Sequence, residues 1–167
     1  MSVAVEMARD SVAQRLWARD RLMASVRGLD ASRLSEDMAM GQGTLLLTLE
    51  HMLQAEEVWI SVLEGDGAVK VTPGTLTSLE AIEAAWPGVD ARWAQSMYEL
   101  TEGRLGETVS RTSSLMQRTY ALKVRDVLLH VSTHAMYTLA QAANMVRRLG
   151  GEAPSTGYAA WVVEGKG

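Results

Sequence analysis

Residues 123–149, KVRDVLLHVSTHAMYTLAQAANMVRRL, are the stretch of sequence that decides the fold. Apolar side chains recur there every three or four residues and form one stripe, and Gly150-Gly151 ends the pattern. This spacing predicts one long amphipathic helix that stops at the glycines. Such a helix needs partner helices to cover its apolar stripe.

Two histidines, His130 and His134, lie one helical turn apart in this predicted helix. Because residues four positions apart share a helix face, both imidazoles can point at the same partner helix. Thr138 and Gln141 continue the same row at steps of four and three residues. The only other histidine, His51, lies in a second apolar stretch. If that stretch packs here, the three imidazoles converge on one point.

Three neutral imidazoles with one open position form a familiar catalytic site for a divalent metal ion. The sequence makes such a site possible without showing that a metal binds. The alternative for His51 is a neutral core histidine that makes one hydrogen bond, which is the commoner role of a single buried histidine.

Three further stretches have helical periodicity, at residues 5–27, 44–64 and about 77–100. Pro87-Gly88 interrupts the third and predicts either a kink or two shorter helices. Gly106 to Leu122, rich in Thr and Ser, predicts an extended crossover or a small hairpin. We therefore expect one all-α domain over residues 1–167, a four-helix bundle with one long crossover.

Several charged residues are expected to face solvent. The first helix turns Arg15 and Arg19 away from its apolar stripe, and Glu50 and Glu56 lie well round the second helix from His51. We interpret Glu50 and Glu56 as surface charges rather than as catalytic bases, and we expect Arg15 and Arg19 to lie at the surface as well.

Apolar helix surface exceeds what a single four-helix core requires, notably at Trp17, Trp59 and Trp93. This excess predicts a homodimer formed through helix faces.

Composition narrows the function further. The net charge of −4 opposes a nucleic-acid partner, and the lack of cysteine excludes disulfides, thiolate metal sites and cysteine nucleophiles. No stretch approaches the ~20 apolar residues of a membrane span. The N-terminal residues show no basic start followed by an apolar run, so we expect a cytoplasmic protein without a signal peptide.

Three stretches together resemble the DinB family, which includes DinB and YfiT-like proteins. WARDRL at 17–22 is similar to its first-helix signature, TLEHMLQAEEVW at 48–59 to its second, and LLHVSTHAMYTLAQ at 128–141 to its last. The similarity spans nearly the whole chain. It implies an up-down-down-up four-helix bundle, usually dimeric, that holds a divalent ion such as zinc or nickel.

In that family one histidine of the second helix and two of the fourth, spaced H-x3-H, hold the metal. His51 and His134 match the first two ligands, whereas the third falls on Thr138, and Gly157 replaces an aspartate of many relatives. A shifted site of His51, His130 and His134 is the alternative, although the ion would then move ~6 Å along the helix.

The resemblance also implies an activity. Relatives use the metal in low-molecular-weight thiol transfer and thiol-dependent isomerisation, and Gln141 would be a pocket group. The alternative is a non-catalytic dimeric bundle whose cleft binds a small ligand or partner. A DNA-binding role in the stress response is suggested only by the family's damage-inducible name and is opposed by the net charge.

Overall fold

Four long helices carry most of the chain: α1 (Val3–Arg27), α2 (Leu45–Leu63), α3 (Leu79–Tyr98) and α5 (Val124–Arg148). The computed structural model describes residues 2–113 and 116–165. The shorter elements are η1 (Ala31–Arg33), α4 (Glu102–Gly106), β1 (Thr108–Ser113), β2 (Arg118–Lys123) and α6 (Tyr158–Glu164). The prediction of an all-α fold is confirmed.

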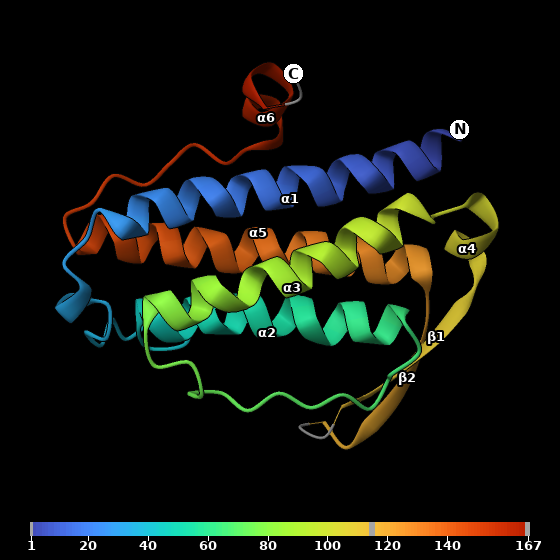
Figure 1. Ribbon diagram of the computed structural model, residues 1–167, viewed down its shortest axis with the longest axis horizontal. Helices are drawn as coiled ribbons and strands as arrows, with labels where there is room; N and C mark the ends of the chain where they lie inside the picture. Colours follow the sequence, from blue (N-terminus) through green and yellow to red (C-terminus); the bar gives the residue numbers. More distant parts are fainter. Residues whose placement is uncertain (1, 114–115, 166–167) are drawn as a thin grey trace.

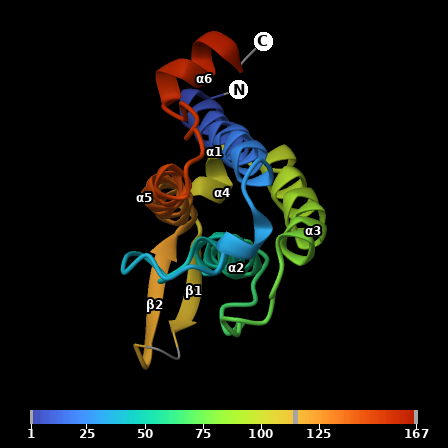
Figure 2. The ribbon, with the colours of Figure 1, turned by 90° about the vertical axis from the view of Figure 1, so that its left-hand side faces the viewer.

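The long helices lie side by side (Figures 1 and 2). The α5 helix packs against both α1 and α2, and α2 packs against α3. In Figure 1, α1 and α5 run in one direction, and α2 and α3 run in the other. The α6 helix packs across α1, where it buries Trp161. The α2–α5 contact joins the two helices that carry the histidines.

Capping residues fix where three of these helices begin. The side-chain oxygens of Ser2, Thr44 and Ser78 accept hydrogen bonds from backbone N–H groups in the first turns of α1, α2 and α3. This capping satisfies donors that have no partner within the helix. These three helices start within two residues of the positions expected from the sequence.

Pro87 does not divide α3, which is one helix from Leu79 to Tyr98 with the proline inside it. A proline removes one backbone hydrogen bond from the helix interior. The flanking Trp86 and Val89 are both buried against the rest of the bundle. Tertiary packing of this face accounts for the continuity of the helix, because burial of large apolar side chains outweighs one missing hydrogen bond.

The stretch before α5 forms a β-hairpin. Of the two structures expected for this region, an extended crossover or a small hairpin, the second is therefore present. Strands β1 and β2 pair antiparallel, with Thr108 opposite Lys123. The backbone N–H of Thr112 donates to the carbonyl of Gly67 at 2.7 Å, so the hairpin is tied to the loop after α2. A Cβ atom at Gly67 would lie 2.0 Å from the Ser110 carbonyl oxygen, so only glycine allows this approach.

The expectation that Arg15, Arg19, Glu50 and Glu56 are surface charges is wrong. Their exposed fractions are 2%, 8%, 1% and 6%. Arg15 forms an ion pair with Glu56, and Arg19 forms one with Asp90. Helix periodicity placed them outside the apolar stripe, but partners on neighbouring elements allow them to be buried.

Glu50 ties the loop that precedes α3 to α2. Its carboxylate accepts hydrogen bonds from the backbone N–H groups of Gly74, Thr75 and Leu76 at 2.6, 2.8 and 2.9 Å. Burial alone would raise the pKa of Glu50, but these hydrogen bonds outweigh it and hold the pKa below its ordinary value. The folded state therefore favours the charged carboxylate.

Replacing Glu50 with glutamine should lower the free energy of unfolding by ~1–3 kcal/mol at neutral pH, because the amide nitrogen faces backbone donors instead of accepting from them. Since folding lowers the pKa of Glu50, its contribution is complete above the unfolded value of 4.5 and is lost as the pH falls through the folded value. Urea unfolding at several pH values measures this. If the variant were as much less stable than the parent below pH 4.5 as it is at neutral pH, the role of the carboxylate would be contradicted.

Candidate functional site

His51 and His134 meet where α2 packs against α5. Their Nε2 atoms are 3.3 Å apart and form a hydrogen bond, in which one neutral ring donates and the other accepts, and the rings pack edge to face with centroids 5.2 Å apart. Both side chains are half-buried. The packing of α2 against α5 therefore brings together two histidines that are 83 positions apart in the sequence.

His130 lies beside this pair but faces a different neighbour. Its ring centroid is 5.9 Å from that of His134 and 4.7 Å from that of Trp59, against which it packs edge to face. The His130 side chain is exposed. Trp59 thus adjoins the site, which the sequence reasoning missed. The available signal was its position eight residues after His51, about two turns further along the same helix.

Thr138, at the position of the family's third ligand, uses its hydroxyl within its own helix. The hydroxyl donates to the carbonyl oxygens of His134 and Ala135 at 3.1 and 3.0 Å, and the residue is 2% exposed. Gln141 packs against Gly41 in the loop before α2. The two residues are so close that a Cβ atom at position 41 would lie 2.9 Å from Gln141 Oε1.

Gly157, the other departure from the family pattern, precedes the first residue of α6. Its extended backbone needs no glycine, with φ −67°.

The histidines are neutral at physiological pH. Burial lowers the pKa of His51 and of His130. Burial, together with the charges that His51 and His130 would carry, lowers the pKa of His134 to about 4. Only a deprotonated imidazole nitrogen binds a metal ion, so the site presents the ligand form without first losing protons.

The residues present fit two positions around a tetrahedral ion. Two imidazole nitrogens bound at ~2.0–2.1 Å with tetrahedral angles lie about 3.3 Å apart, and the Nε2 atoms of His51 and His134 are 3.3 Å apart. Within residues 2–113 and 116–165, no three His, Asp or Glu side chains are grouped to hold one ion. The donor set therefore fits a metal in part: two imidazoles are in place and a third protein ligand is not.

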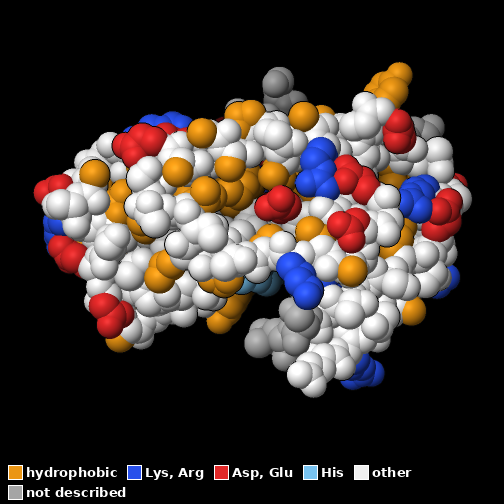
Figure 3. All heavy atoms as spheres, turned by 60° about the horizontal axis from the view of Figure 1, so that its bottom comes forward, with side chains coloured by type: hydrophobic (Ala, Val, Ile, Leu, Met, Phe, Trp, Pro, Cys, Tyr) orange, Lys and Arg blue, Asp and Glu red, His pale blue; other side chains and the backbone are white. Residues whose placement is uncertain are grey.

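The site opens outward between the bundle and the hairpin. Figure 3 shows histidine surface, in pale blue, at the edge of a hollow between these two parts of the molecule.

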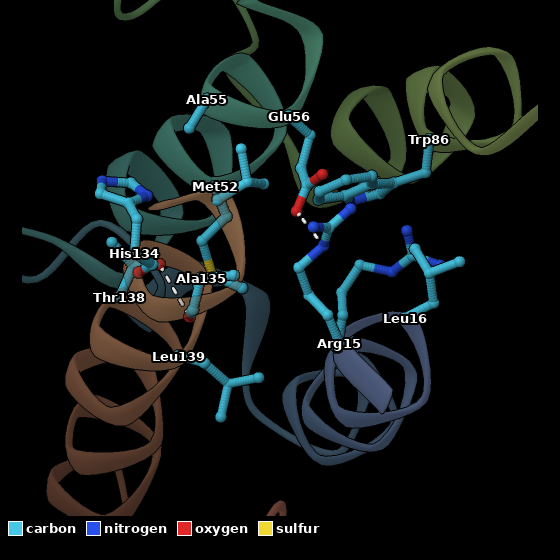
Figure 4. Close-up of a pocket in the computed structure, with 12 residues that line it drawn as sticks. Arg15, Leu16, Met52, Ala55, Glu56, Trp86, His134, Ala135, Thr138 and Leu139 are labelled. Carbon is cyan, nitrogen blue, oxygen red and sulfur yellow. Dashed lines mark hydrogen bonds and ion pairs between the residues drawn. The ribbon is translucent and has the colours of Figure 1, made fainter. Parts of the chain in front are cut away.

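On its inner side, His134 lines a small cavity at the centre of the bundle (Figure 4). The cavity has a volume of about 10 Å³, and residues of α1, α2, α3 and α5 form its wall. Thr138 lies in the same wall as His134, and Arg15 and Glu56 belong to the part formed by α1 and α2. The candidate site therefore adjoins the buried charges.

Arg15 and Glu56 form a buried ion pair, with Arg15 Nε 2.8 Å from Glu56 Oε1. The Arg15 guanidinium lies over the Trp93 ring at 4.4 Å. Burial raises the pKa of the Glu56 carboxyl, which the charge of Arg15 opposes. The Trp93 indole N–H also acts to lower that pKa, although its geometry falls short of a hydrogen bond with any described residue.

In the part of the chain that the structure describes, no helix is both long enough and apolar enough to cross a membrane.

Comparisons with known proteins agree with this architecture. A DinB-like protein from Bacillus cereus has a similar crystal structure, with a TM-score of 0.65 at 18% sequence identity over 84% of this chain and 91% of that chain. At this identity the likeness concerns the fold alone. No curated protein matches the chain. The family model described as DinB family matches residues 1–163, and the chain therefore belongs to the DinB family.

Proposed function

We propose that this protein binds a divalent transition metal ion, zinc or nickel, through His51 and His134, and acts as a metal-dependent thiol transferase or isomerase. The observation that carries the proposal is that the two Nε2 atoms face each other at 3.3 Å, a hydrogen-bonding distance that is also compatible with two neighbouring ligands of one tetrahedral ion. Membership of the DinB family supports it. The lowered pKa values of both histidines support it as well, because they favour the ligand form.

When bound, the metal would supply a Lewis acid that stabilises a thiolate or polarises a substrate carbonyl. The chain contributes the rest of the site. His51 and His134 orient their Nε2 atoms towards one point, and the exposed His130 is the nearest further imidazole. Trp59 provides an aromatic wall beside His130. The outward hollow admits a small substrate, for which a low-molecular-weight thiol is our proposed class.

A second function is favoured by one observation. The hydroxyl of Thr138 is engaged by carbonyl groups of its own helix, so the family's third ligand has no functional equivalent at this position. In this alternative the protein is a non-catalytic bundle that binds a small ligand or partner in the hollow beside the histidines.

Replacing Thr138 with histidine should strengthen zinc or nickel binding by at least ~10-fold, because it supplies a third imidazole one turn from His134. Calorimetric titration of untagged protein measures the affinity. The matched control is Ala140→His, at an exposed position on the same helix. If Thr138→His bound these ions no more tightly than Ala140→His, the cleft would not be a metal site of the family type.

The tryptophans that the sequence placed at a dimer interface are not exposed. Trp93 is fully buried, and Trp17 and Trp59 are half-buried. Exposed apolar side chains occur instead on α1 and α5, where Met7 is 67% and Leu129 is 66% exposed and both line one groove. We propose that this α1–α5 face forms a homodimer.

Light scattering at micromolar concentration should give twice the chain mass of 18.2 kDa. Leu129→Asp should shift the mass to that of one chain, because a charge would be buried without a partner. Tyr98→Asp, at an exposed position on α3, should leave the dimer intact. A parent protein that scatters as a single chain would refute the dimer.

A further inference from the structure

We infer that the β1–β2 hairpin carries a carboxylate-binding site, formed by the guanidinium of Arg118 beside the ring of Tyr120 and facing the hollow next to the histidines. The inference deepens the proposed function, because it rests on the binding of a small ligand in that hollow and adds that this ligand has a carboxylate group. It applies both to a thiol substrate and to a ligand that is bound without reaction.

The hairpin is a basic segment of an acidic chain. Residues 108–123 contain Arg111, Arg118 and Lys123 and neither aspartate nor glutamate. The rest of the chain has all 20 acidic residues and 13 of the 16 basic ones, so the hairpin carries a charge of +3 and the remainder −7. A local excess of positive charge attracts a small anion, whereas the negative remainder repels a polyanion such as a nucleic acid.

These three positive charges have no carboxylate partner among the described residues. Arg111 and Lys123 donate hydrogen bonds to backbone carbonyl groups, which are neutral. The Arg118 guanidinium makes no hydrogen bond to a described residue, and its Cζ atom lies 5.4 Å from the centroid of the Tyr120 ring. The N–H donors of Arg118 are therefore available to a ligand.

The strand register places Arg118 on the side of the hairpin that faces the bundle. Leu122 of β2 and its partner Val109 of β1 both pack against the hydrophobic core. Side chains two positions apart on a strand point to the same side, so Tyr120 and Arg118 share this side with Leu122. Figure 3 shows a basic side chain, in blue, and the histidine surface, in pale blue, both bordering the hollow between the hairpin and the bundle.

An arginine in this setting suits a carboxylate. The planar guanidinium offers two parallel N–H groups that match the two carboxylate oxygens. The Tyr120 ring supports the guanidinium by a cation–π contact, which does not use its N–H donors. On the bundle side, Trp59 and His130 provide aromatic surface for the apolar part of the ligand. The site therefore takes a small molecule with a carboxylate at one end and, under the proposed function, a thiol at the other.

The test compares two series of probes on metal-free and on zinc-loaded parent protein. The first series is 3-mercaptopropionate and its longer straight-chain homologues, and the second is the mercapto alcohols of the same lengths. NMR titration that follows the Arg118 Nε–Hε signal measures the affinity and the point of contact. At one or more lengths the acid should bind at least ~3-fold more tightly than its alcohol and should shift the Arg118 signal, which the alcohol should not.

The variant Arg118→Met removes the guanidinium and should reduce the affinity for the acid to that for the alcohol, without changing the latter. The matched control is Arg147→Met. Arg147 is also exposed and without a carboxylate partner among the described residues, but it lies in the last turn of α5, at the end of that helix away from the hairpin. This control should keep the preference for the acid.

Equal binding of acid and alcohol at every length in the parent, or no binding of either, would overturn the inference. A preference for the acid that survives in Arg118→Met would overturn it as well. Failure of the proposed metal function gives a different result, in which added zinc leaves the affinity for both series unchanged. The preference of the metal-free protein for the acid would then still decide whether the hairpin binds a carboxylate.

Discussion

Replacing Glu56 with alanine is expected to lower the free energy of unfolding by about 3–5 kcal/mol, because it leaves the Arg15 charge buried without its partner. Arg15 Nε and Glu56 Oε1 are 2.8 Å apart, and both side chains are more than nine-tenths buried. Removing one member of such a pair costs more than the pair itself contributes, since the remaining guanidinium keeps its desolvation penalty. Urea unfolding at neutral pH measures the change.

Two further variants make this expectation specific. Glu57→Ala changes the adjacent, half-buried glutamate and should alter stability by no more than ~0.5 kcal/mol. Arg15→Met/Glu56→Met removes both charges and should recover most of the stability lost in Glu56→Ala, because apolar side chains of similar size can replace a buried ion pair. A loss below about 1 kcal/mol in Glu56→Ala would show that solvent reaches the Arg15 charge.

The helical framework is accessible from the sequence because it depends on local patterns. Apolar spacing and Gly150 identify the long helices to within a few residues. The local sequence pattern did not predict that α3 continues through Pro87 as one helix. This continuity depends on packing against other helices, which the local sequence does not describe.

The buried charges were mispredicted for a related reason. Arg15 and Glu56 are 41 residues apart, and nothing in the periodicity of either helix indicates that they meet. The same holds for Glu50, whose partners are backbone N–H groups of a loop about 25 residues further on. A charge outside the apolar stripe is usually solvated, so single-sequence reasoning assigns the commoner environment.

The candidate site was more predictable than these buried charges, because the order and spacing of the three histidines resemble those of a known family. The spacing of His130 and His134 placed them on one face, and the family resemblance selected His51 and His134. The structure brings the latter two to 3.3 Å. The packing of His130 on Trp59 and the internal bonds of the Thr138 hydroxyl depend on side-chain conformations. The sequence pattern does not contain that information.

His51→Ala should abolish zinc or nickel binding, because it removes one of the two proposed ligands. The change also removes the hydrogen bond and ring contact with His134. A loss of ~1–3 kcal/mol in the free energy of unfolding is therefore expected in either case. The metal measurement separates the two roles, because a His51 that is only a core residue would leave metal binding unchanged. His130→Ala separates the two ligand sets. It should leave binding through His51 and His134, whereas the shifted site would lose the ion.

Proton competition gives the same proposal a pH dependence. Because the pKa of His134 is lowered to about 4, protons should compete weakly with the metal ion at neutral pH. Affinity should therefore fall less steeply below neutral pH than it would for two imidazoles with the ordinary pKa of 6.5, because folding lowers the pKa of both. Titration of the parent across this range measures the effect.

The central claim is that His51 and His134 are the protein ligands of one divalent ion. Calorimetric titration of untagged protein with zinc and with nickel, in the parent and in His51→Ala, tests it most directly. The account predicts one ion per chain in the parent and no detectable binding in the variant. A parent that binds neither ion, or a variant that binds as the parent does, would contradict it.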